Sequence, residues 1–382
     1  MKFSYYAPTK VYFGSIDFNN LRTEINKYGK KILILSGGDA TTNIAKQIML
    51  ALGANYSIEL FNGIVSNPLT SVIEDIAVKA MIPDIILSVG GGSVHDSAKA
   101  LSILFTHNGR VEDFTTDGSI SVSGISDKTL PIITIPTISG SGAEVSPASL
   151  IRVKDKKRVI FSPNIYPKAT FIDPKYAATT SREVCINTAL DALVQGIESY
   201  VSINSQDFSK RYSLTAIKRV IESLINLDSP ANSPYALEQI ALASIESLYA
   251  VGQSTVGAVH AISDPLSGIF NLHHGEAVAF LLPFVIEINY PYAENQYEDI
   301  KAIFNTMLEI KTATLHESIF EFYKRIGFDY KIIAKKLKTN NIHCYMEQCI
   351  KDSYNNDMEG NPYNLDDFDI EKILNKALGN RL

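Results

Sequence analysis

The chain has 382 residues, of which 46% are apolar and 20% are charged, with 35 Lys and Arg against 41 Asp and Glu. This composition excludes a disordered chain, a collagen and a small disulfide-stapled scaffold. The net charge of −6 provides no general positive field, so we expect a small-molecule partner and neither a nucleic acid nor a membrane. At about 150 residues per domain, the length predicts two domains.

Cysteine usage and the N-terminal segment bear on the compartment. Cys185, Cys344 and Cys349 show no metal-binding spacing and are odd in number, which is typical of reduced thiols. The N-terminal segment MKFSYYAPTK lacks the apolar core of a signal peptide. The longest apolar run, at 277–286, is well short of the roughly 20 residues that span a membrane. We therefore predict a cytoplasmic protein.

The first half of the chain alternates short β-rich runs with helical stretches. The runs at 32–35, 84–89 and 131–135 are mainly apolar and do not alternate with polar residues. Continuous hydrophobicity means that both faces of a strand are covered, which is typical of parallel strands in an α/β layer. After the second run, apolar residues recur at helical spacing over 94–105 and predict a strand–turn–helix unit.

Strand-like runs almost vanish in the second half of the chain. Stretches such as 277–288 carry helical periodicity, and the acidic segment at 352–369 is expected to form a solvated surface. Between the halves, residues 173–181 combine a proline with several N-cap candidates. We therefore predict an α/β domain over 1–178 and an all-helical domain over 179–382.

Two glycine-rich segments follow predicted strands. In the first, 88–99 (SVGGGSVHDSAK), three glycines open a helix whose free N–H groups and dipole favour a phosphate. In the second, 136–144 (PTISGSGAE), hydroxyl groups beside flexible backbone suit phosphate, ribose or a carboxamide. Either segment alone is also compatible with an ordinary loop, and the first is not a G-x-G-x-x-G motif. Together they favour a nucleotide crevice at the carboxyl ends of the strands.

A polar stripe runs along one predicted helix. Asp191, Gln195 and Glu198 recur at i, i+4 and i+7, while apolar residues cover most of the remaining surface. Taken alone, such a stripe more often faces water. If the helix is central, an internal carboxylate must be paired, protonated or bound to a cation.

Two histidines lie in an apolar segment that does not resemble a surface loop. His260 precedes an expected helix break at Pro265, and His274 precedes the next helix. A lone histidine in such a segment is more often a structural core residue. Two imidazoles, a carboxylate and an amide oxygen together form a donor set for one divalent metal. Spacing leaves open whether His273 or His274 points inward.

Over nearly its whole length the chain resembles the iron-dependent (group III) alcohol dehydrogenases. The resemblance rests on the order and spacing of short motifs, namely 61–68 (FNGIVSNP), 90–99 (GGGSVHDSAK), 111–114 (VEDF), 136–144 (PTISGSGAE), Asp173-Pro174, the Asp191 helix, the segment from His260 to Glu276, and Asn361-Pro362. It implies the dehydroquinate synthase-like fold, with a dinucleotide-binding α/β domain, an all-α domain for metal and substrate, and an active site in the cleft between them. It also implies a homodimer.

By position, the resemblance assigns roles to individual residues. The implied cofactor-binding residues, for NAD or NADP, are Gly37, Gly38, Asp39, Gly91, Gly92, Ser93, Asp96, Thr137, Ser139, Ser141 and Lys157. The implied ligands of one divalent metal, Fe²⁺ or Zn²⁺, are Asp191, Gln195, His260 and His274. The implied catalytic residues are His260, His274 and Asp264.

Three positions depart from the family pattern. Gln195 replaces a histidine ligand, which exchanges an imidazole nitrogen for a weaker amide oxygen and predicts lower affinity for iron or a change of metal. Asp264 replaces a histidine that relays protons and contacts nicotinamide, and a carboxylate is a poorer relay near neutral pH. Gly37 stands where NAD-preferring members often have an aspartate, although Asp39 follows, so NAD against NADP stays open.

The resemblance predicts a metal-dependent, NAD(P)-linked oxidoreductase that interconverts an alcohol with an aldehyde or ketone by hydride transfer. Gln195 and Asp264 favour a polar or sugar-like substrate, such as the primary hydroxyl of a Kdo-type sugar acid. The alternatives are a lyase of the dehydroquinate synthase type, a metal-free enzyme of the maleylacetate reductase type, and a catalytically silent nucleotide-binding protein.

Overall fold

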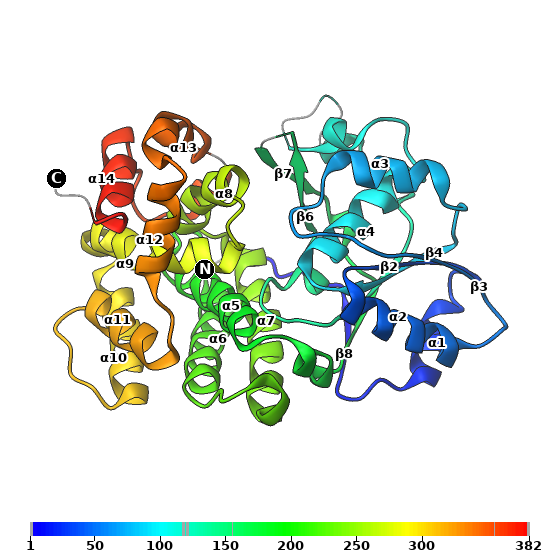
Figure 1. Ribbon diagram of the computed structural model, residues 1–382, viewed down its shortest axis with the longest axis horizontal. Helices are drawn as coiled ribbons and strands as arrows, with labels where there is room; N and C mark the ends of the chain where they lie inside the picture. The colour runs from blue at the N-terminus through cyan, green and yellow to red at the C-terminus, as the bar shows by residue number, and fades with distance from the viewer. Residues whose placement is uncertain (1–2, 117–118, 120–121, 155, 355, 380–382) are drawn as a thin grey trace. The chain divides into compact units, whose positions relative to one another are not determined.

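The computed structural model describes residues 3–116, 119, 122–154, 156–354 and 356–379 (Figure 1). The chain forms two compact units, Ala7–Thr179 and Thr180–Leu382, and the latter also includes Met1–Tyr6. Aromatic contacts explain this placement of the N-terminal segment. The rings of Phe3 and Tyr5 lie with their centroids 5.5 and 5.7 Å from that of Phe208 in the helical unit.

A six-stranded parallel sheet forms the centre of the α/β unit, with the strand order β1-β8-β5-β4-β2-β3. Its strands are β1 (Lys10–Phe13), β2 (Lys31–Ser36), β3 (Ser57–Phe61), β4 (Ile85–Gly90), β5 (Ile132–Pro136) and β8 (Ala169–Ile172). The three strands expected from continuous apolar runs are β2, β4 and β5, and all three are confirmed. An antiparallel hairpin is formed by β6 (Ala148–Val153) and β7 (Lys156–Phe161).

Both faces of the sheet are covered by helices. Side chains such as Ile34 and Leu87 pack with α1 (Phe18–Ile25) and α2 (Asp39–Leu52). Side chains of opposite orientation, such as Leu33, pack with α3 (Thr70–Lys79) and α4 (Gly92–Leu104). Because successive strand residues point to opposite faces, this three-layer arrangement requires strands that are mainly apolar on both faces.

Among its described residues, the second unit contains helices and loops but no strand. Its α-helices are α5 (Arg182–Val201), α6 (Asp207–Ile225), α7 (Pro234–Ser254), α8 (Ala258–Phe270), α9 (His274–Asn289), α10 (Glu294–Leu308), α11 (Leu315–Ile326), α12 (Tyr330–Thr339), α13 (Met346–Asp352) and α14 (Asp367–Ala377). The N-cap of α5 is Ser181, whose hydroxyl accepts a hydrogen bond from the Val184 amide at 3.2 Å. Because α5 packs against α6, α7 and α9, its polar stripe is inside the unit.

Short 3₁₀ helices complete the chain, at Val111–Phe114, Val122–Gly124, Ala143–Val145, Pro163–Ile165, Pro174–Thr179, Pro230–Asn232, Tyr290–Tyr292, Ile342–Tyr345 and Asn356–Gly360. The fold class expected from the sequence, a parallel α/β unit followed by a helical unit, is confirmed. Among the described residues, we find no helix that is both long enough and apolar enough to cross a bilayer.

One expected boundary is wrong. Helix α8 continues through Pro265 to Phe270 instead of breaking there. A proline inside a helix removes one backbone donor and favours a break. Here Ser263, Pro265 and Leu266 are buried where α8 packs against α9 and α13, and this packing keeps the segment helical.

Candidate active site

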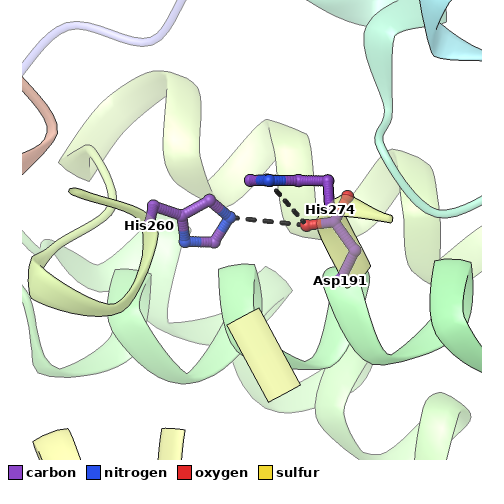
Figure 2. Close-up of side chains that lie close together, drawn as sticks. All are labelled: Asp191, His260 and His274. Atoms are coloured by element: carbon purple, nitrogen blue, oxygen red, sulfur yellow. Dashed lines mark ion pairs between the residues drawn. The ribbon is translucent and has the colours of Figure 1, made fainter. Parts of the chain in front are cut away.

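Three side chains from three helices of the second unit converge on one point. Asp191 comes from α5, His260 from α8 and His274 from the start of α9, and Figure 2 shows both imidazoles directed at the Asp191 carboxylate. Nε2 of His260 lies 3.4 Å from Oδ1 of Asp191, and Nε2 of His274 lies 3.9 Å from the same atom. One potential ligand atom from each residue falls within 4.8 Å of the others. Of the adjacent pair, His274 is therefore the histidine that joins this cluster.

Glu198 determines which nitrogen of His260 is available. Its Oε2 lies 2.5 Å from Nδ1 of His260, and its Oε1 accepts a hydrogen bond from the Val259 amide at 2.6 Å. Since a carboxylate only accepts, Nδ1 carries the hydrogen. Nε2 is buried, makes no hydrogen bond and lies near Oδ1 of Asp191, so it is the nitrogen available to the cluster. Metal-ligating histidines are oriented by carboxylates in this way.

The charges around His260 favour a cation. Burial lowers the pKa of His260, but Glu198 and Asp191 outweigh burial and raise it well above the usual range. The cluster therefore attracts positive charge, as a proton or as a divalent ion. Two imidazoles and a carboxylate fit both Zn²⁺ and Fe²⁺. Nε2 of His260, which makes no hydrogen bond, and the donor set thus fit the metal that the resemblance implied.

The N-terminus of α8 is held by a residue from the far end of the chain. Oδ1 of Asn361 accepts a hydrogen bond from the Ala258 amide at 3.2 Å. Asn361 also forms a reciprocal amide pair with Asn289, with distances of 2.7 and 3.0 Å. Asn361 is only 7% exposed, so the expectation of a solvated surface over 352–369 is wrong at this residue.

A close helix contact places His274. The next residue, Gly275, approaches α5 so closely that an added Cβ would lie 1.8 Å from the backbone oxygen of Asn187. Glu276 contacts the same region, because its Oε1 accepts a hydrogen bond from Nδ2 of Asn187 at 3.4 Å. The absence of a side chain at Gly275 therefore allows α9 to begin beside Asp191.

Gln195 lies beside the cluster, one turn after Asp191 on α5. Its Nε2 donates to Oδ1 of Asp191 at 3.1 Å, and its Oε1 accepts from the Ser247 hydroxyl of α7 at 2.7 Å. Asp191 and Gln195 are 5% and 6% exposed, so the stripe does not face water. Asp264 is half-buried on α8, one turn after His260 and on the same face.

The two glycine-rich segments are neighbours in the α/β unit. Strands β4 and β5 pair in parallel up to Gly90 and Pro136, and the Thr137 amide donates to the Gly90 carbonyl at 3.0 Å. A Cβ at Gly92 would lie 2.8 Å from the Ser141 hydroxyl oxygen. The start of α4 and the following loop therefore share one sheet edge, where parallel sheets bind ligands.

The remaining residues of the first glycine segment are internal. Asp96 lies 3.7 Å from Nζ of Lys99, and this Nζ donates to the Ala148 carbonyl at 2.6 Å. Burial raises the pKa of Asp96 to about 6, although Lys99 and Lys157 act in the opposite direction. These contacts tie α4 to β6, while the half-buried Lys157 lies on β7. A cofactor contact by Asp96 or Lys157 stays a prediction.

The end of β2 lies next to the end of β4 in the sheet. Gly37 and Gly38 follow β2, and Asp39 is the exposed first residue of α2. A Cβ at Gly37 would lie 3.1 Å from the Thr41 hydroxyl oxygen and 3.3 Å from the Ile64 carbonyl oxygen. The edge therefore carries two helix N-termini, which suit an anionic ligand.

Three supporting residues received no role from the sequence. Glu198 was visible only as part of the polar stripe, whose periodicity places it on the same face as Asp191. Asn361 belonged to a recognised motif without a stated function. Ser247 had no signal, because nothing in the helical pattern of α7 marks one buried serine among its small residues.

Comparison with known proteins identifies the family. The family profile described as iron-containing alcohol dehydrogenase matches residues 8–174, and that of the C-terminal part of the same family matches residues 185–378. An alcohol dehydrogenase of Thermococcus barophilus is 30% identical over 330 residues, which are 84% of each chain. A 1-propanol dehydrogenase of Citrobacter freundii is 30% identical over 290 residues, 75% of this chain and 73% of that one.

A solved structure shares the fold over the whole chain. Sulfoacetaldehyde reductase from Bifidobacterium kashiwanohense, in complex with NAD⁺, covers 99% of both chains with a TM-score of 0.84 at 21% identity. The two family profiles follow each other along this chain in the order of its two units. The chain therefore belongs to the iron-containing alcohol dehydrogenase family and is a metal-dependent, NAD(P)-linked alcohol dehydrogenase.

Proposed function

We propose that this enzyme interconverts a primary alcohol and its aldehyde, with one Fe²⁺ or Zn²⁺ ion held by Asp191, His260, His274 and Gln195. The observation that carries the proposal is the convergence of ligand atoms from three helices within 4.8 Å. The buried Nε2 of His260 supports it, since this atom makes no hydrogen bond and lies 3.4 Å from Oδ1 of Asp191, where a cation would contact both.

The roles of the chain's own residues follow from their contacts. When bound, the divalent ion polarises the substrate oxygen as a Lewis acid, and the nicotinamide exchanges hydride with the carbinol carbon. Asp191 supplies the negative charge that holds the cation. His260 and His274 supply neutral nitrogen donors, and Glu198 keeps the hydrogen of His260 on Nδ1.

Asp264 is the residue that we propose for substrate preference and proton exchange. It lies one helical turn after His260 and therefore on the same face of α8. As a carboxylate, it accepts hydrogen bonds from hydroxyl groups and disfavours other carboxylates. We infer a preference for alcohols with a further hydroxyl, including sugar-like ones. Among sugar acids of the Kdo type, the primary hydroxyl end is the end that fits this residue.

For the cofactor, we propose that the N-terminus of α4, with Gly91, Gly92 and Ser93, binds the pyrophosphate of NAD or NADP. Free N–H groups at a helix start and a glycine turn that admits close approach support this assignment. The remaining proposed contacts of the same edge are Gly37, Gly38, Asp39, Asp96, Thr137, Ser139, Ser141 and Lys157. Comparing kcat/KM with NAD and with NADP would identify the preferred cofactor.

The decisive experiment combines elemental analysis with an activity screen. Purified protein is assayed for Fe and Zn, then for NAD(P)H change with 1-propanol, 1,3-propanediol and a Kdo-type acid. The expected result is one equivalent of metal and turnover of a hydroxylated substrate. Turnover of a phosphorylated sugar acid without net NADH change would indicate the lyase. Full activity without metal would indicate an enzyme of the maleylacetate reductase type. Cofactor binding without turnover would indicate the catalytically silent protein.

A pair of histidine variants tests the ion site. His274→Ala removes one donor and should abolish both metal content and turnover while the fold persists in circular dichroism. His343→Ala, at an exposed histidine outside the cluster, is the matched control and should retain both. Full activity of metal-free His274→Ala protein would refute the assignment.

The homodimer remains a proposal that rests on the resemblance. Light scattering after size exclusion measures the mass in solution directly. A single species with the mass of two chains is expected, and a species with the mass of one chain contradicts the proposal.

A further inference from the structure

Two consecutive residues near the end of the chain, Gly360 and Asn361, bond to all three helices that carry the metal cluster or to the backbone next to them. The Gly360 carbonyl accepts a hydrogen bond from the Ile203 amide, just after the end of α5, at 3.1 Å. Oδ1 of Asn361 accepts from the Ala258 amide, at the start of α8, at 3.2 Å. The same atom accepts from Nδ2 of Asn289, the last residue of α9, at 2.7 Å. One short segment therefore links α5, α8 and α9.

The side chain of Asn361 has one possible orientation. Because the Ala258 amide only donates, the atom of Asn361 that faces it must be Oδ1. Because the Tyr363 carbonyl only accepts, the atom that faces it at 2.6 Å must be Nδ2. Nδ2 also donates to Oδ1 of Asn289 at 3.0 Å. Asn361 is therefore fixed as a hydrogen-bond acceptor toward the start of α8.

The backbone before Asn361 packs tightly against the loop that leads into α8. A Cβ at Gly360 would clash with the Val256 carbonyl oxygen. A Cβ at Gly257 would lie 3.1 Å from Oδ1 of Asn361 and 3.1 Å from Oε1 of Glu198. The absence of side chains at these two glycines therefore lets two acceptors approach the start of α8.

These two acceptors hold the first residues of α8. The first amides of a helix have no acceptor inside the helix and need partners from elsewhere. Asn361 provides an acceptor for the Ala258 amide. Glu198 provides one for the Val259 amide at 2.6 Å, and its other carboxylate oxygen lies 2.5 Å from Nδ1 of His260. Three consecutive residues are thus held from outside the helix, and the third is a member of the metal cluster.

We propose that Asn361 is a positioning residue that holds the start of α8 where His260 binds the metal ion. Ala258 is 0% exposed, so its amide is costly to leave without an acceptor. Loss of Oδ1 at position 361 therefore favours conformations in which the first turn of α8 unwinds. If the ion binds only the wound turn, its apparent affinity falls in proportion to the wound fraction. This inference rests on the proposed function, because it requires an ion at the metal cluster.

The test is a Co²⁺ titration of chelator-treated full-length protein, read by the dissociation constant and by visible absorption. Loss of a residue that supports a metal ligand typically costs about 10- to 100-fold in affinity. We expect Asn361→Ala to weaken Co²⁺ binding by about tenfold, at the lower end of that range, because Asn361 bonds the helix backbone next to the ligand.

Hydrogen exchange provides a readout that needs no metal. In chelator-treated Asn361→Ala protein, the peptide covering 256–262 should exchange its amide hydrogens faster than in wild type, because the start of α8 opens more often. Unchanged Co²⁺ affinity in the folded variant overturns the inference even where this exchange is faster. Faster exchange together with weaker binding is the expected result.

Asn164→Ala is the matched control. Nδ2 of Asn164 donates to the Ile125 carbonyl at 2.9 Å and so joins two distant segments of the α/β unit. The control should leave Co²⁺ affinity and the exchange of 256–262 unchanged, and an equal loss of affinity in it overturns the inference. If circular dichroism shows Asn361→Ala to be unfolded, Asn361→Ser replaces it with the same expected result, because serine keeps a polar group at this buried position.

A double-mutant cycle with Glu198→Gln shows whether Asn361 acts through the start of α8. Either substitution alone removes one of the two external supports of that turn. The combined loss of Co²⁺ affinity should therefore be smaller than the product of the two separate losses. Losses that multiply would mean that the two residues act independently, and they would overturn the inference.

His274→Ala distinguishes failure of this inference from failure of the proposed function. If His274→Ala abolishes Co²⁺ binding while Asn361→Ala leaves it intact, only the role of Asn361 is wrong. If His274→Ala also leaves binding intact, the ion site itself is wrong. The expected pattern is abolition by His274→Ala and about tenfold weakening by Asn361→Ala.

Discussion

The metal cluster, formed by Asp191, His260 and His274, and the glycine-rich edge, formed by the turns after β2 and β4, are constructed in opposite ways. In the helical unit, the cluster depends on buried side chains that other buried side chains orient, as Glu198 orients His260 at 2.5 Å. At the edge of the parallel sheet, the ends of β2 and β4 offer mainly backbone, and a Cβ at Gly91 would lie 2.8 Å from Ile138. The first site needs particular side chains to be present, and the second needs them to be absent.

The two sites should therefore be damaged by opposite kinds of substitution. Removing a hydrogen-bonding group should damage the metal cluster, because a buried polar partner left unpaired is costly. Adding a methyl group should damage the glycine edge, because packed interiors do not yield easily. Gly275 is the exception, since the metal cluster also depends on one missing side chain.

Gly275→Ala should have the largest effect. The new Cβ would lie 1.8 Å from the Asn187 carbonyl oxygen, so α9 must move away from α5 and carry His274 with it. We expect a destabilisation of about 3 kcal/mol or more and loss of most bound metal, measured by thermal unfolding and elemental analysis. Gly252→Ala, where a Cβ has open space, is the control. Normal metal content in Gly275→Ala protein contradicts the role given to this contact.

Glu198→Gln should come next. The amide keeps the shape of the side chain but loses the charge that fixes the hydrogen of His260 on Nδ1. Metal affinity should fall by about 10- to 100-fold, measured by competition with a chelator. The neighbouring variant Glu183→Gln, at an exposed position in the first turn of α5, should bind metal normally. Equal affinity of the two variants would show that Glu198 does not support His260.

Gly91→Ala tests the other side of the comparison. The added methyl group meets Cγ2 of Ile138 at 2.8 Å, a contact that forces the turn or the side chain to shift. We expect KM for the cofactor to rise by about tenfold, which corresponds to 1.4 kcal/mol, with metal content unchanged. If Gly91→Ala lowered the metal content and left the KM for the cofactor unchanged, the glycine turn would not act separately from the metal cluster.

The smallest expected effect concerns acid stability of the α/β unit. Burial alone would raise the pKa of Glu24, but hydrogen bonds from Lys27, Tyr12 and Lys10 lower it to about 2 from 4.5. The lowered pKa stabilises the fold fully above pH 4.5, and this stabilisation is lost as the pH falls toward 2.

Glu24→Gln measures that contribution. The thermal midpoint of wild type should exceed that of Glu24→Gln at neutral pH, and the difference should shrink between pH 4.5 and about 2. Glu238→Gln, at an exposed glutamate of α7, should match wild type across this range. A difference that is constant with pH would show that Glu24 acts through packing.

The sequence predicted the sheet better than it predicted the site's support. A mainly apolar run without polar alternation identifies β4, because both faces of this strand are covered. The helix break predicted at Pro265 was wrong, because the tertiary packing that keeps α8 helical cannot be inferred from the local sequence. The period of Asp191, Gln195 and Glu198 placed them on one face without showing whether it was buried.

The hydrogen bonds that support the site could not be predicted from the sequence, because they join residues far apart in the chain. Ser247 bonds a residue 52 positions away, and Asn361 bonds the Ala258 amide 103 positions away. Periodicity reports only neighbours within a helix or strand, so it cannot pair such residues. The family resemblance predicted which residues are ligands, and the structure shows which residues orient those ligands.

The anchoring of α8 by Asn361 has a consequence for biosynthesis. A ribosome that has translated His274 has already produced Asp191 and both imidazoles, yet the segment that fastens the start of α8 still lies in untranslated message. Loading of the ion during synthesis would therefore meet an unfastened helix, whereas loading after release meets a finished one.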